Sequence, residues 1–154
     1  MELDETDIKI LKNLLVDARS SSRQLAYRLG LSTVTVITRI KKLEQRKIIT
    51  GYSARLDHQQ IGYDLVAIIE VTTGKGKMLE VEQKIADNEN ICAVYDITGQ
   101  SDILVIGKFK NRMELSDFVK KLSAIPNVEN TVTHMVLNTV KDHVSYSVFD
   151  IGYG

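Results

Sequence analysis

The sequence is poor in the residues that characterise several protein classes. It has one cysteine, Cys92, and one proline, Pro126, among 154 residues, and it has no tryptophan. A single cysteine excludes an internal disulfide framework and is typical of a reducing cytoplasm. No apolar run approaches the ~20 residues that span a bilayer, and the acidic start MELDETDIKI lacks the hydrophobic core of an export signal. We therefore expect a cytoplasmic protein that does not enter membranes.

Patterns that indicate catalysis or a cofactor are also missing. His58, His134 and His143 are far apart and have no cysteine or acidic residue at ligand spacing, so no metal site is predicted. The glycines of TGKGK, residues 73–77, have the wrong spacing for a phosphate-binding loop. No serine–histidine–aspartate or paired-carboxylate arrangement stands out. The sequence predicts no enzyme and no cofactor.

Acidic residues are scarce in one part of the chain, residues 19–55. The whole sequence is neutral, but residues 1–60 carry a net charge of +4 and residues 61–154 a net charge of −4. Residues 19–55 contain nine basic residues against Glu44 alone, a net charge of +8. Solvated surfaces usually mix both signs, so this segment favours a polyanionic partner.

The N-terminal part reads as three helices. Apolar residues recur at helical spacing over residues 4–17, in a short segment that ends at Gly30, and over residues 33–45, where Ser32 is the expected cap. Two short helices joined by a glycine-containing turn, the second of them basic, are typical of a helix-turn-helix. The alternating, β-branched segment KIITGYSARLD that follows predicts a strand or a β-wing.

The C-terminal part changes period and predicts the order β-α-β-β-α-β. The expected elements are strands at 64–73, 91–98, 102–109 and 128–140, and helices at 76–88 and 111–125. This order is that of a ferredoxin-like αβ-sandwich, with both helices on one face of an antiparallel sheet. The other face needs a cover. The alternating segment 143–151 is too short to supply it, so we expect a partner subunit to pack sheet to sheet.

Two residues of the predicted strands have ordinary structural interpretations. Cys92 has no evident activating base and is expected to be a small core residue. His134 falls on the same strand face as Val132 and Val136 and is expected to pack there.

The basic third helix is the first candidate binding site. In a major groove, hydroxyl and basic side chains near the start of such a helix reach base edges and phosphates. Capping alone also explains some of the hydroxyls. The side chains expected to contact double-stranded DNA are Arg19, Ser22, Arg23, Ser32, Thr33, Thr35, Thr38, Arg39, Lys41 and Lys42.

The turn TGQSD, Thr98 to Asp102, is the second candidate. Gly99 permits a positive φ, and successive free N–H groups at such a turn can bind a carboxylate. Asp102 could bind an ammonium group, so the turn suits the two ends of a free amino acid. The same residue types are also common in any hairpin turn.

In the order and spacing of several segments, the sequence resembles the Lrp/AsnC, or feast/famine, family of prokaryotic transcription regulators. These segments are LDETDIKIL, LAYRLGLS, VITRIKKLE and IITGYSARLD in the N-terminal part, and VYDITGQSD and IPNVENTVT in the C-terminal part. The resemblance covers nearly the whole chain. It implies a winged helix-turn-helix over residues 1–50, a β-strand linker over 51–62, and an αβ-sandwich domain over 63–154 that mediates oligomerisation and effector binding.

The resemblance also implies partners and roles. It implies a sequence-specific regulator that forms dimers and often octamers, with a small effector, commonly an amino acid, bound between dimers. The effector residues it implies are Gly99, Gln100, Ser101 and Asp102, with Thr131 and Thr133 from a neighbouring subunit. The family usually has glycine where this chain has Lys47, so the recognition helix is expected to end differently or to extend. The alternative is a haem-biosynthesis (siroheme-type) decarboxylase acting on a tetrapyrrole, since such enzymes share both domains.

Overall fold

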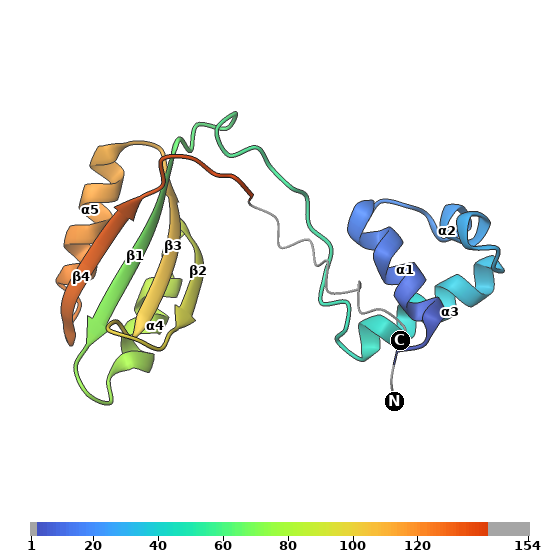
Figure 1. Cartoon of the computed structure of the whole chain (residues 1–154), viewed down its shortest axis with the longest axis horizontal. Helices are drawn as coiled ribbons and strands as arrows, with labels where there is room; N and C mark the ends of the chain where they lie inside the picture. Colours follow the sequence, from blue (N-terminus) through green and yellow to red (C-terminus); the bar gives the residue numbers. More distant parts are fainter. Residues whose placement is uncertain (1–2, 142–154) are drawn as a thin grey trace. The chain divides into compact units, whose positions relative to one another are not determined.

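The computed structural model describes residues 3–141, which form parts of two compact units. Along the chain, the boundary between the units falls between Arg55 and Leu56 (Figure 1). Each unit is described by itself. Within the described residues, the first unit contains the helices α1 (Glu5–Val16), α2 (Ser22–Leu29) and α3 (Thr33–Gln45). Nowhere in residues 3–141 is a helix both long enough and apolar enough to cross a bilayer.

Side-chain caps fix where these helices begin. Asp4 and Ser21 each form a reciprocal capping box with the residue three positions on, Asp7 and Gln24. Ser32 accepts a hydrogen bond from the Thr35 N–H at 3.0 Å. Ser32 is the cap expected for α3, and α1 and α3 begin at or next to the predicted residues 4 and 33.

Leucine and β-branched residues build the core of this unit. Ile10, Leu11 and Leu43 join α1 to α3, and Leu25, Ala26 and Val36 join α2 to α3. Gly30 ends α2 in the left-handed conformation, with φ of 66°. On α3, Val36 and Leu43 are buried and Ile40 packs against them, so one stripe of the helix faces the core.

Two expectations about the end of α3 and the segment after it are wrong. The helix ends at Gln45 and does not extend, and Lys47 itself adopts the left-handed conformation that a glycine would adopt there, with φ of 58°. No strand forms within residues 48–57: this part of the chain has no regular secondary structure. A strand needs a hydrogen-bonded neighbour, and nothing else in residues 3–141 pairs with this segment.

The second unit has the predicted β-α-β-β-α-β order. Its elements are β1 (Leu65–Thr73), α4 (Met78–Ala86), β2 (Ile91–Asp96), β3 (Ile103–Phe109), α5 (Arg112–Ser123) and β4 (Val128–Met135). The strands form one antiparallel sheet in the order β2-β3-β1-β4, visible from right to left in Figure 1. Strand β4 ends at Met135, opposite Ala67 near the start of β1, and so is shorter than the predicted 128–140.

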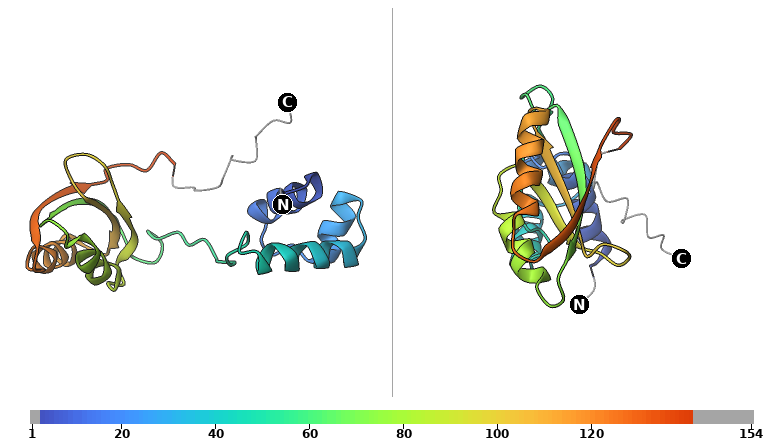
Figure 2. Two further views of the ribbon diagram at one scale, coloured as in Figure 1. Left: turned by 90° about the horizontal axis from the view of Figure 1, so that it is seen from below. Right: turned by 90° about the vertical axis from the view of Figure 1, so that its left-hand side faces the viewer.

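Both helices lie on one face of this sheet, as Figure 2 (left) shows. The core lies between the two layers. Ile69 on β1, Val105 on β3 and Val81 on α4 are fully buried, and Leu122 on α5 is almost fully buried. The rings of Phe109 and Phe118 meet at 5.4 Å between centroids. The α+β class and the ferredoxin-like arrangement are confirmed.

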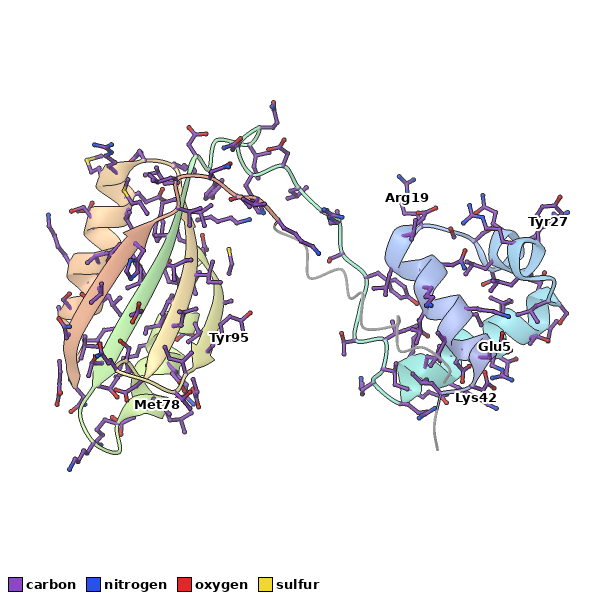
Figure 3. All side chains as sticks on the ribbon, in the orientation of Figure 1. Glu5, Arg19, Tyr27, Lys42, Met78 and Tyr95 are labelled. Atoms are coloured by element: carbon purple, nitrogen blue, oxygen red, sulfur yellow. The ribbon has the colours of Figure 1, made fainter. Side chains whose placement is uncertain are left out.

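The opposite face of the sheet has no cover from residues 3–141. Its side chains follow from the strand register, and most of them are apolar. We call this the open face; it consists of Val66, Ile68, Glu70, Ala93, Tyr95, Leu104, Ile106, Val132 and His134. Tyr95 projects from β2 at its edge (Figure 3). The segment 143–151, considered as a cover above, lies outside the described residues.

Two predicted packing roles are wrong. Cys92 is exposed, because the register of β2 shifts between Ile91 and Ala93 and leaves the intervening residue in a bulge. His134 does not pack against its valine neighbours. It is exposed on the open face, where its Nε2 lies 3.0 Å from the Glu70 carboxylate on the adjacent strand.

Candidate nucleic-acid interface and ligand-binding turn

Helix α3 presents a solvent face opposite its buried stripe. Thr38, Lys41 and Lys42 are exposed on it, and Thr33 is exposed on the first turn, at the border of this face with the buried stripe. None of these four side chains is used by the core. The face combines hydroxyl groups on the first two turns with ammonium groups on the third.

Further cations lie where α2 begins. Arg19 and Arg23 flank the capped N-terminus of α2 and are exposed, and Arg19 is seen projecting from the unit in Figure 3. Ser22, the first residue of α2, is half-buried. A helix N-terminus with basic neighbours attracts anions, because its free N–H groups carry partial positive charge.

Three of the predicted contact residues are engaged within the unit. The Ser32 hydroxyl caps α3 and lies 2.8 Å from the Thr35 hydroxyl, so these two groups satisfy each other. The Arg39 guanidinium donates to the carboxylates of Asp4 and Asp7 on α1. The guanidinium holds the pKa of Asp4 below its usual value, and the two carboxylates raise the pKa of Arg39. In this geometry Arg39 joins α3 to α1 and does not extend toward a ligand.

Sequence reasoning missed three exposed side chains of this unit. Val34 and Ile37 on α3 are 73% and 40% exposed, and Tyr27 on α2 is 92% exposed (Figure 3). The sequence carried a signal for Val34 and Ile37. Both fall outside the core-facing stripe of Val36, Ile40 and Leu43, and an apolar residue outside that stripe has no explanation in core packing.

The TGQSD turn joins β2 to β3. Gly99 has φ of 135°, a conformation that favours glycine, which confirms the predicted positive φ. Gln100 is exposed. Two side chains of the predicted site are engaged within the fold, however: the Ser101 hydroxyl donates to the Glu70 carboxylate at 2.9 Å, and the Asp102 carboxylate accepts from the Thr73 N–H at 2.7 Å. The turn therefore leaves Gln100 exposed and uses Ser101 and Asp102 for its own structure.

Two threonines predicted to assist the turn lie elsewhere in the sheet. Thr131 and Thr133 are on β4, paired with Val71 and Ile69 of β1, which place them on the helix-covered side. Strand β1 separates β4 from β3, so the chain does not bring these threonines to its own turn. Any shared site needs the threonines of another subunit, as the resemblance implies.

One pair of carboxylates lies beside this turn. Asp96 is the last residue of β2, and its carboxylate hydrogen-bonds the side chain of Glu82 on α4. That hydrogen bond, together with burial, raises the pKa of Glu82 to about 7. The pair therefore shares a proton in mildly acidic solution.

Both units match one family along most of the chain. Residues 3–44 match the AsnC-type helix-turn-helix domain, and residues 66–146 match the Lrp/AsnC ligand binding domain. The HTH-type transcriptional regulator PH1692 of Pyrococcus horikoshii is 45% identical over 142 residues, which are 92% of this chain and 96% of that protein. Ptr1 of Methanocaldococcus jannaschii, also an HTH-type transcriptional regulator, is 34% identical over 141 residues, 91% of this chain and 95% of its own.

Solved structures agree with this assignment. The Neisseria meningitidis transcriptional regulator NMB0573, crystallised as an L-Met complex, superposes with a TM-score of 0.89 at 28% identity, covering 96% of this chain and 97% of that one. E. coli AsnC superposes with a TM-score of 0.86 at 25% identity, covering 95% and 100%. The relatives are transcriptional regulators and not enzymes, so the decarboxylase alternative is set aside. The chain belongs to the Lrp/AsnC family of transcriptional regulators.

Proposed function

We propose that this regulator binds double-stranded DNA in a sequence-dependent manner through α3, with α2 contacting the phosphate backbone. The observation that carries the proposal is the net charge of +8 over residues 19–55, together with the exposure of Arg19, Arg23, Lys41 and Lys42. Thr33 and Thr38 contact base edges, and the four cations contact phosphates. Ser32 and Thr35 serve the helix cap, and Arg39 orients α3.

A salt titration tests this proposal. The full chain is mixed with a fluorescently labelled duplex selected from a random library, and the dissociation constant is measured by anisotropy at increasing salt. Each phosphate contact adds about 0.9 to the steepness of the log–log plot. Lys41→Ala should reduce that slope by about one contact, whereas Lys84→Ala, on α4 of the other unit, should leave it unchanged. An affinity that does not depend on salt, or no binding to any duplex, contradicts the proposal.

The effector site is assigned to the TGQSD turn. The N–H groups around Gly99 bind the carboxylate of a free amino acid, and Gln100 contacts the rest of it. The complex of the Neisseria relative with L-Met makes amino acids the first class to test. Isothermal titration calorimetry with the full chain and a panel that includes L-methionine should find one binder. Gln100→Ala should weaken that binder, and Gln59→Ala, in the connecting segment, should not. Equal binding to both variants removes Gln100 from the site.

The open face is assigned to the contact with a second copy of the chain. Ile68, Leu104 and Ile106 form an apolar centre that residues 3–141 leave uncovered. A dimer buries this centre and supplies two helix-turn-helix units for two half-sites on DNA. Analytical ultracentrifugation of Ile106→Asp should give a smaller species than the unsubstituted chain, while Met113→Asp, on the exposed side of α5, should not. A monomeric unsubstituted chain contradicts this assignment.

A further inference from the structure

The solvent face of α3 carries an apolar strip that the fold does not use. Val34 lies on the first turn, 73% exposed, and Ile37 follows one turn later, 40% exposed. Neither belongs to the clusters formed by Val36, Ile40 and Leu43. β-Branched residues also restrict side-chain freedom in a helix, so alanine would serve the helix better at an exposed position. Helix stability does not explain either side chain.

The position of the strip relative to the polar groups points to its ligand. At 100° per residue, Val34 lies between Thr38 and Lys41 on the solvent face, and Ile37 flanks Lys41 on the side nearer the core. An apolar group surrounded by hydroxyl and ammonium groups would contact a surface that is polar and anionic but carries isolated methyl groups. The major groove of DNA has this character only where thymine presents its C5-methyl.

We propose that Val34 and Ile37 read thymine through its C5-methyl group, so that A·T base pairs are specified by apolar contact at these two positions. This inference rests on the proposed DNA binding and adds the chemical basis of its sequence preference. Thr33 and Thr38 hydroxyls can pair with several base edges and discriminate weakly. The two apolar side chains discriminate more sharply, because only one of the four bases offers them a partner.

Uracil substitution provides a direct test, because 2′-deoxyuridine pairs as thymidine does and lacks only the methyl group. Duplexes selected by the full chain are resynthesised with deoxyuridine at each thymidine in turn, and dissociation constants are compared by anisotropy. At the contacted positions the affinity should fall about fourfold per methyl, the transfer free energy of one CH₂ group. Each of the variants Val34→Ala and Ile37→Ala should lose the preference for thymidine over deoxyuridine at the base position that the substituted side chain contacts, and should keep it at the other.

Val16→Ala is the matched control. It removes the same side chain from an 89% exposed position at the end of α1, and it should keep the preference for thymidine. Circular dichroism should show unchanged folding for all three variants, since none of the side chains is part of the core. Equal affinity of the unsubstituted chain for thymidine and deoxyuridine duplexes, or a full methyl preference in both Val34→Ala and Ile37→Ala, overturns the inference while DNA binding stands. Failure to bind any duplex overturns the proposed function and this inference with it.

Discussion

The guanidinium group of Arg39 on α3 lies 3.0 Å from the carboxylate of Asp7 on α1. Asp7 is largely buried, so removing its partner leaves a poorly solvated negative charge. Arg39→Ala should lower the free energy of unfolding by about 1–2 kcal/mol, less than for a fully buried pair because the arginine is partly exposed. Urea denaturation followed by circular dichroism measures this. Lys42→Ala, which removes an exposed cation from the same helix, should change stability little. Equal stability of Arg39→Ala and the unsubstituted chain would show that the pair is dispensable.

Lys47 adopts a left-handed backbone conformation that costs a residue with a Cβ atom about 1 kcal/mol. Lys47→Gly should therefore raise the free energy of unfolding by up to about 1 kcal/mol, the higher entropy of glycine in the unfolded chain offsetting part of the gain. Lys47→Ala removes the same charge and side chain but keeps the Cβ, and should give no such increase. Thermal unfolding of the three proteins distinguishes them. If the alanine variant is as stable as the glycine variant, the effect comes from the side chain and not from the backbone.

Asp102 accepts two hydrogen bonds from Thr73, from its N–H at 2.7 Å and from its hydroxyl at 3.2 Å. Asp102→Ala leaves the N–H without this acceptor and should destabilise the second unit by about 1–3 kcal/mol. Gln100→Ala, two residues away on the same turn, should leave unfolding unchanged. Chemical denaturation tests both variants. If Asp102→Ala is destabilised and also loses effector binding, the loss is explained by damage to the turn. A loss of effector binding in Gln100→Ala, which keeps its stability, is explained by a lost contact with the ligand.

The Glu82–Asp96 pair predicts a pH dependence of stability. Folded Glu82 keeps its proton up to a pKa of about 7, whereas in the unfolded chain the group ionises near 4.5. Between these values the folded state binds more protons, so this group's contribution to stability falls as pH rises through the window. From about pH 5 to about pH 8 the loss should be about 1 kcal/mol, reduced by solvent screening.

Glu82→Gln cannot ionise and should remove this decrease, which urea denaturation at a series of pH values will measure. Glu89→Gln, an exposed carboxylate on the loop after α4, should retain it. A Glu82→Gln profile that falls as steeply as that of the unsubstituted chain would contradict the assignment of the shared proton.

Local signals predicted the helices and the sheet well because they act over a few residues. Ser32 before α3 and Gly30 after α2 serve the caps that their positions predicted. The apolar segments 64–73 and 102–109 predicted the strands β1 and β3. These features depend on hydrogen bonds and burial patterns that sequence spacing records directly.

The errors arose where a side chain's role depends on a distant residue. Arg39 belongs by spacing to the basic helix, but two carboxylates more than thirty positions earlier hold it. His134 alternates with valines, yet its partner Glu70 is on another strand. The register shift that exposes Cys92 is set by how β2 pairs with β3. Spacing along one segment carries no information about such pairings.

The Glu70 carboxylate, which accepts from Ser101, forms with His134 a polar spot in a mostly apolar sheet face. A surface that seals this face would remove water from the remaining acceptor positions of the carboxylate, so it must offer a polar group or a trapped water at that point. Apolar contacts alone tolerate sliding, whereas a single ionised group in their midst does not. Glu70 thus restricts the orientations in which a second chain could pack on the sheet.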